Sequence, residues 1–242
     1  MMEGSSNILQ WMPLVAAAVG AFFGGLAAFV VSQVNESVKR RRERWFKHRN
    51  ALVQLEYLLN EITDVLSANR HVATVAIGSI PKNDIGLRIV WSEPRALPYD
   101  SSLLTTFLRI ELIKELFSYG VKIRRLNNDT ETICRAYSEM RSGLLRQDLS
   151  KDQYFHSLTE FQKGLENLIK AYDLMDVRTE ALLARTRATL RKDKLHYKPL
   201  FFKMPSLKDI TQFEIDTELK CLREEIAKVR SQSKSEIEQY LG

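Results

Sequence analysis

The chain has 242 residues, with 36 Lys or Arg against 30 Asp or Glu and a formal net charge of +6. A basic balance by itself suggests a nucleic-acid partner, but most of this excess lies in one short segment. Residues 36–50 carry a balance of +5, whereas residues 51–242 hold 29 basic and 27 acidic side chains. The two cysteines, Cys134 and Cys221, form no C-x-x-C motif and give no reason to expect a disulfide. Composition therefore argues against nucleic-acid binding and against a disulfide-stabilised fold.

Residues 4–35 form a stretch of 32 residues without an ionisable side chain. Its apolar part, residues 9–34, is long enough to cross a hydrocarbon layer about 30 Å thick as one helix. A cleaved secretory signal is the alternative, but such signals have a basic start and an apolar core of about 7–15 residues, and this chain has neither. We therefore predict a transmembrane helix over residues 9–34, after a short extracytoplasmic N-terminus of residues 1–8.

Small residues line one broad face of this predicted span. They form two adjacent rows with a spacing of four residues: Ala16, Gly20 and Gly24, and Ala17, Ala21 and Gly25. Such faces let helix backbones approach closely and mediate association in lipid. The alternative is that Ala and Gly are simply frequent in membrane helices. We expect a homo-oligomer that associates through this face.

A strongly basic segment follows the span directly, whereas no Lys or Arg precedes it. Its cations are Lys39, Arg40, Arg41, Arg42, Arg44, Lys47 and Arg49. Basic residues flanking a span mark its cytoplasmic side. The pattern predicts a single-pass protein of the plasma membrane, the inner membrane if the source is bacterial, with its N-terminus outside and its C-terminal domain in the cytoplasm.

The anchor helix is expected to continue into the cytoplasm, because no Gly or Pro occurs between Leu26 and Gly78. Apolar residues recur at heptad spacing along it: Val38, Trp45, Leu52, Leu59 and Leu66, with Leu55 and Ile62 at the second heptad position. About three heptads are too few to establish a coiled coil on their own. Residues 35–68 are therefore either a coiled-coil stalk or one helix of a bundle.

Residues 72–98 form the main predicted interruption of the helical pattern. Two runs with high β propensity, residues 72–77 and 85–91, flank a turn-prone cluster at residues 81–84. A small β-hairpin or an extended crossover loop fits this pattern.

The remainder reads as long amphipathic helices, and residues 69–242 are predicted to form a cytosolic helical domain. Asp100 or Ser101 caps the first helix, and Gly120 either ends or kinks it. Ser150 and Gln153 form a capping box before a helix of about 40 residues, and Ser206 with Asp209 forms another before the final helix. The predicted fold is mainly all-α, with four or five long helices in a bundle.

A second basic segment, which also contains aromatic residues, lies between the last two helices. The residues predicted to contact a membrane surface are the cations Arg185, Arg187, Arg191, Lys192, Lys194, Lys198 and Lys203 and the aromatic residues Phe201 and Phe202. Such a segment can dock on anionic lipid. The alternative is a basic helix C-terminus, favoured by the helix dipole, with aromatic residues that close the bundle. Whether this segment lies at the membrane end of the bundle is expected to depend on the number of helix reversals. If the chain reverses direction at Gly120, the segment returns to the membrane. If Gly120 lies inside a helix, the segment lies far from the membrane.

No motif of a known catalytic class occurs in the sequence, including the phosphate loop, the dinucleotide fingerprint, H-E-x-x-H and the nucleophile elbow. His48, His71, His156 and His196 lack metal-ligand spacing. We therefore expect no cofactor and no catalytic activity. The sequence favours a membrane-anchored interaction or regulatory module with the lipid bilayer and an unidentified protein as partners. A membrane-perturbing effector that oligomerises through its anchor is the alternative, and a membrane-tethered enzyme of an uncharted class is less favoured.

Overall fold

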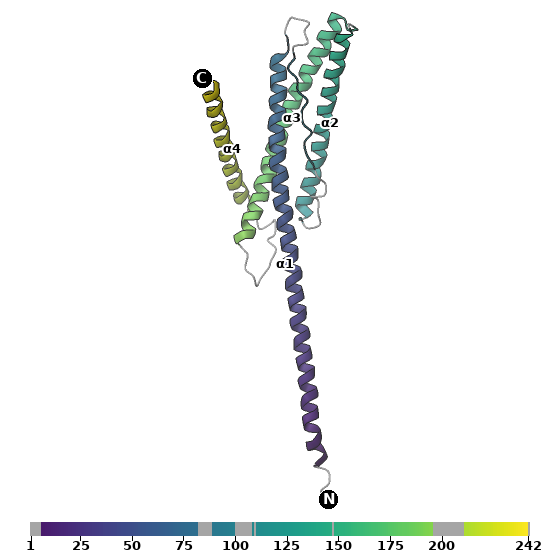
Figure 1. Ribbon diagram of the computed structural model, residues 1–242, viewed down its shortest axis with the longest axis vertical. Helices are drawn as coiled ribbons and strands as arrows, with labels where there is room; N and C mark the ends of the chain where they lie inside the picture. The colour runs from purple at the N-terminus through teal and green to yellow at the C-terminus, as the bar shows by residue number, and fades with distance from the viewer. Residues whose placement is uncertain are drawn as a thin grey trace. The chain divides into compact units, whose positions relative to one another are not determined.

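The fold is all-helical in the part of the chain that the computed structural model describes (Figure 1). The backbone is described for residues 6–81, 89–99, 108, 110–146, 148–195 and 211–241, and the side chains for residues 12–81, 89–99, 108, 110–146, 148–192 and 211–228. The helices are α1 (Ser6–Ser79), α2 (Ile110–Leu145), α3 (Lys151–Leu195) and α4 (Gln212–Leu241). Over these residues the structure confirms the predicted all-α class and contains no strand.

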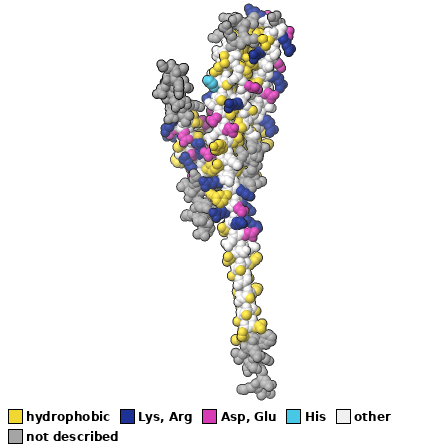
Figure 2. Space-filling view, viewed as in Figure 1, with side chains coloured by type: hydrophobic (Ala, Val, Ile, Leu, Met, Phe, Trp, Pro, Cys, Tyr) yellow, Lys and Arg dark blue, Asp and Glu magenta, His cyan; other side chains and the backbone are white. Residues whose placement is uncertain are grey.

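The chain divides into two compact units, of which the first comprises residues 1–47 and 198–202 and the second comprises residues 48–197 and 203–242. In the first unit, α1 carries an apolar stretch with an 18-residue window of mean hydropathy 2.4, none of it buried. Figure 2 shows this part of α1 without acidic or basic side chains. Among the described residues, α1 is the helix that is long and apolar enough to cross a membrane.

In the second unit, the heptad residues of α1 lie in the bundle core. Leu52, Leu55, Leu59, Ile62 and Leu66 are at most 1% exposed and share one hydrophobic cluster with α2 and α3. The same apolar spacing serves a coiled-coil seam and the inner face of a bundle helix. From residue 48 onward the second of the two expectations, one helix of a bundle, therefore applies.

The prediction of a β-strand at residues 72–77, the first strand of the possible hairpin, is wrong. Residues 72–79 belong to α1, and Ala73 and Ala76 are fully buried beside the aromatic residues of α3. This burial outweighs the local β propensity, which depends strongly on context. Residues 82–88 lie outside the described residues, and residues 89–99 form an irregular segment, in keeping with the alternative of a crossover loop.

Hydrogen bonds show that this crossover segment runs back along α1. The Val90 amide donates to Ser79 Oγ (2.8 Å), and the Asn69 side chain exchanges two hydrogen bonds with the Arg95 backbone (2.7 and 2.8 Å). The Asn127 side chain binds the Leu97 backbone in the same way. Because the segment reverses direction, α2 runs parallel to α1.

Gly120 lies inside the continuous helix α2, so it does not end a helix. The ring of Tyr99 packs on it so closely that a Cβ at this position would collide with the ring. The basic C-terminal end of α3 lies beside residue 56 of α1, because Arg187 pairs with Glu56. The position of this end relative to the membrane stays a prediction.

The predicted amphipathic helix after Ser150 is confirmed as α3, because the apolar and threonine residues that recur every three or four positions from Tyr154 to Thr186 are all buried. The predicted capping box is present: the Ser150 amide donates to Gln153 Oε1 (2.9 Å) and the Gln153 amide donates to Ser150 Oγ (3.3 Å). α4 begins with a box formed by Thr211 and Glu214. The predicted caps Asp100, Ser101, Ser206 and Asp209 lie outside the described residues.

Candidate functional site

The small-residue face in the apolar part of α1 is uncovered. Ala16, Ala17 and Ala21 are exposed, and a Cβ added at Gly20, Gly24 or Gly25 would meet no atom within 4 Å. Glycine without a neighbour in a helix interior loses stability relative to alanine without gaining a contact. Close approach of another helix is the usual compensation for small residues in a membrane span.

The basic flank surrounds α1 rather than forming one stripe. Lys39, Arg40, Arg41 and Arg42 are consecutive, so successive side chains point about 100° apart around the helix. Arg40 pairs with Glu36 (2.5 Å), and the Arg42 guanidinium lies 5.7 Å from the centre of the Phe46 ring. Arg44 and Lys47 are exposed, and Arg49 is partly exposed. A collar of this kind fits a zone of anionic headgroups on every side of a helix.

The described cations of the second basic segment all pair with glutamates from other helices. Arg185 pairs with Glu115 of α2, and Arg187 binds both Glu56 of α1 (2.8 Å) and Glu225 of α4 (3.0 Å). Arg191 pairs with Glu218 (2.5 Å) and Lys192 with Glu214 (3.2 Å), both of α4. The side chains of Lys194, Lys198, Phe201, Phe202 and Lys203 lie outside the described residues.

Sequence reasoning identified these cations but missed their partners. Glu214, Glu218 and Glu225 recur at helical spacing on one face of α4, and Arg187 and Arg191 do so on α3. Opposite charges on matching faces of two successive helices are the signal from which this interface can be found. For Arg185, Arg187, Arg191 and Lys192, the basic charge is explained by contacts between helices.

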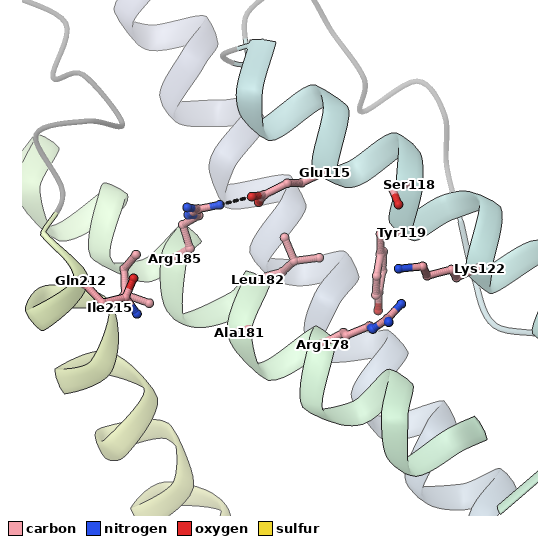
Figure 3. Close-up of a pocket in the computed structure, with 10 residues that line it drawn as sticks. All are labelled: Glu115, Ser118, Tyr119, Lys122, Arg178, Ala181, Leu182, Arg185, Gln212 and Ile215. Atoms are coloured by element: carbon pink, nitrogen blue, oxygen red, sulfur yellow. Dashed lines mark hydrogen bonds and ion pairs between the residues drawn. The ribbon is translucent and has the colours of Figure 1, made fainter. Parts of the chain in front are cut away.

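A cavity of about 490 Å³ opens between α2, α3 and α4 (Figure 3). Its walls include the charged residues Glu115, Lys122, Arg178 and Arg185 and the apolar residues Leu182 and Ile215. Pockets of about 300–1,000 Å³ with apolar walls and a few polar groups are typical of small-molecule sites. No sequence motif marks this cavity, because its residues come from three helices.

Tyr119, which lines the cavity, belongs to a buried hydroxyl pair. The Tyr119 hydroxyl lies 2.5 Å from Thr179 Oγ1, and the Thr179 hydroxyl donates to the Met175 carbonyl (2.8 Å). Because the single Thr179 proton is used in that bond, the Tyr119 hydroxyl is the donor to Thr179. Burial raises the pKa of Tyr119 far above its usual range, with a smaller rise from the nearby Asp176 carboxylate. Tyr119 therefore stays neutral at physiological pH.

No protein-family model, curated protein or solved structure matches the chain. Any function assigned to it must follow from its own geometry and chemistry. Groups of His, Cys, Asp and Glu that could hold a metal ion are also absent among the described residues.

Proposed function

We propose that the protein is a single-pass, membrane-anchored helical interaction or regulatory module, with residues 9–34 in the bilayer and the bundle in the cytoplasm. The observation that carries this proposal is an apolar window of mean hydropathy 2.4 that is fully exposed and is followed by the basic collar. Exposed apolar patches on soluble monomers rarely exceed a few hundred Å². An apolar surface around the whole circumference of a helix matches lipid on all sides.

The docking of α4 supports an interaction role for the bundle. Four ion pairs join α4 to the rest of the second unit: Arg187 with Glu225, Arg191 with Glu218, Lys192 with Glu214, and Arg223 with Glu180. Among the described side chains of α4, Leu222 is the apolar residue that is fully buried. In each pair one partner is exposed and the other is partly or fully buried, and ion pairs with an exposed partner are weakened by salt. We therefore expect a change in charge on this face to weaken the docking of α4.

The small-residue face supports self-association of the anchor. The double variant Gly20→Leu with Gly24→Leu widens this face, so we expect it to abolish proximity between labelled copies, measured by energy transfer in membranes. The matched control is Val19→Leu with Phe22→Leu, which alters the opposite side of the same helix and is expected to leave the transfer unchanged. Equal transfer in all variants would contradict association through this face.

The same variants address the alternative of a membrane-perturbing effector. An effector that acts through oligomeric anchors is expected to depolarise cells on overexpression and to lose this effect in the glycine double variant. An interaction module is expected to leave the membrane potential unchanged. We favour the module, because the span contains no charged or polar row that would line an ion pathway.

A further inference from the structure

The cavity between α2, α3 and α4 presents two cations that the fold leaves unused. Lys122 and Arg178 make neither an ion pair nor a hydrogen bond with any described side chain, whereas Arg185 is paired with Glu115. Three cations and one carboxylate line the cavity, so its walls carry a balance of +2. The nearby Asp176, whose carboxylate influences Tyr119, is not among the lining residues. A cavity with this balance attracts an anion.

The free cations converge on one corner of the cavity. In Figure 3 the side chain of Arg178 extends from α3 toward the hydroxyl of Tyr119, and the side chain of Lys122 extends from α2 toward the ring of Tyr119. That hydroxyl gives its proton to Thr179, so its oxygen keeps lone pairs for a donor such as either cation. Ser118 adds a second hydroxyl to the lining. The corner thus combines a planar guanidinium fork, an ammonium group and a neutral phenol.

The chemistry of this corner fits a phosphate monoester better than a carboxylate. A phosphate monoester carries about −1.5 to −2 charges at pH 7, which matches two cations. The guanidinium fork binds two of its oxygens at once, and the ammonium binds as a point charge. Elsewhere in the cavity lining, Ala181, Leu182 and Ile215 supply apolar side chains. We propose that the cavity binds a phosphate monoester with an apolar body, whether that group belongs to a soluble metabolite or to a lipid headgroup.

Calorimetric titration of the full chain in neutral detergent tests this inference, with phenyl phosphate as the probe and benzenesulfonate as a singly charged ring of similar size. We expect phenyl phosphate to bind more tightly than benzenesulfonate at pH 8, and this preference to disappear as the phosphate gains its second proton below about pH 6. The variants Lys122→Gln and Arg178→Gln are each expected to weaken binding about tenfold or more. Lys114→Gln and Lys170→Gln remove the same charge from α2 and α3 outside the cavity, and we expect them to bind like the wild type.

A soluble lipid distinguishes the two sources of the phosphate group. If the ligand is a lipid headgroup, the chain in neutral detergent binds short-chain phosphatidic acid but not phenyl phosphate, and the cavity variants lose this binding. Failure of both probes, equal affinity for phenyl phosphate and benzenesulfonate, or equal loss in the Lys114 and Lys170 variants would overturn the inference. Thermal unfolding of each variant, followed by circular dichroism, ensures that a loss of binding is not a loss of fold.

Discussion

At the residue scale, two hydroxyl pairs fix α2 against α3 in the buried core. Tyr119 of α2 bonds Thr179 of α3, and Tyr172 of α3 bonds Thr130 of α2 (2.8 Å). Each threonine also donates to the carbonyl four residues before it, so in both pairs the tyrosine is the donor. The two pairs are reciprocal, since each helix contributes one donor and one acceptor. A shift of one helix along the other would leave these buried groups without partners.

Because the tyrosine is the donor in the pair of Tyr119 and Thr179, substitutions of the two residues are predicted to lower stability by different amounts. Tyr119→Phe removes a donor and should lower the free energy of unfolding by about 0.5–1.5 kcal/mol. Thr179→Val leaves the buried Tyr119 hydroxyl without an acceptor and should cost about 1–3 kcal/mol. The double variant replaces both groups by apolar ones and is expected to be less destabilised than Thr179→Val alone. Urea unfolding of the four proteins measures this, and simple addition of the two single effects would contradict the coupling.

Glu214 provides a pH-dependent contact at the start of α4. The Thr211 amide, foremost, and the Lys192 side chain hold the pKa of this carboxyl below its ordinary value of 4.5. Since the folded pKa is lowered, the contribution to stability is present above pH 4.5 and is lost as the pH falls through the folded pKa.

We therefore expect amide protons in the first turns of α4 to exchange faster, after correction for intrinsic rates, as the pH drops below this range. Glu214→Gln should show faster exchange already at neutral pH and a weaker acid effect. Glu224→Gln, an exposed position on the same helix, is the control. An unchanged acid response in Glu214→Gln would contradict this role.

At the scale of elements, the inner face of α1 belongs to the bundle. Leu59 is fully buried in the cluster shared with α2 and α3. Leu59→Ala should lower the free energy of unfolding by about 2–5 kcal/mol, whereas Tyr57→Ala, which alters an exposed side chain, should change it by less than about 0.5 kcal/mol. Urea unfolding in detergent compares the two. A change in oligomer mass for Leu59→Ala without a change in unfolding would instead indicate a seam between copies.

Helices whose apolar residues recur at regular spacing could be predicted from the sequence. Elements whose conformation depends on contacts with residues far away in the chain could not. The stripe of α3 follows from its own spacing, and so does its Ser150 cap, because both depend on residues within a few turns. Residues 72–77 carry β-branched side chains, yet they continue α1 because Ala73 and Ala76 pack against α3, which lies far along the chain. The ion pairs of Arg187 likewise join residues up to 131 positions apart, and no local pattern identifies such partners.

At the scale of the molecule, the distribution of charge distinguishes the two basic segments. The excess positive charge of the chain forms the collar after the apolar span, and the second basic segment is neutralised by the glutamates of neighbouring helices wherever its side chains are described. For the described cations, this pairing favours packing between helices over membrane docking. The cavity beside it contains two cations without an ion-pair partner among the described side chains. It could not be found from the sequence because Lys122, Arg178 and Ile215 come from three different helices.

The most direct measurement for the central claim is the labelling of single cysteines in intact cells. In a background with Cys134→Ser and Cys221→Ser, one variant carries Ser6→Cys before the span and the other carries Ser138→Cys on the exposed surface of α2. We expect a membrane-impermeant maleimide to label the first variant in intact cells and the second after lysis, with both chains in the alkali-resistant membrane fraction. Labelling of Ser138→Cys in intact cells, or release of the chain by alkali, would contradict an anchored protein with a cytoplasmic bundle.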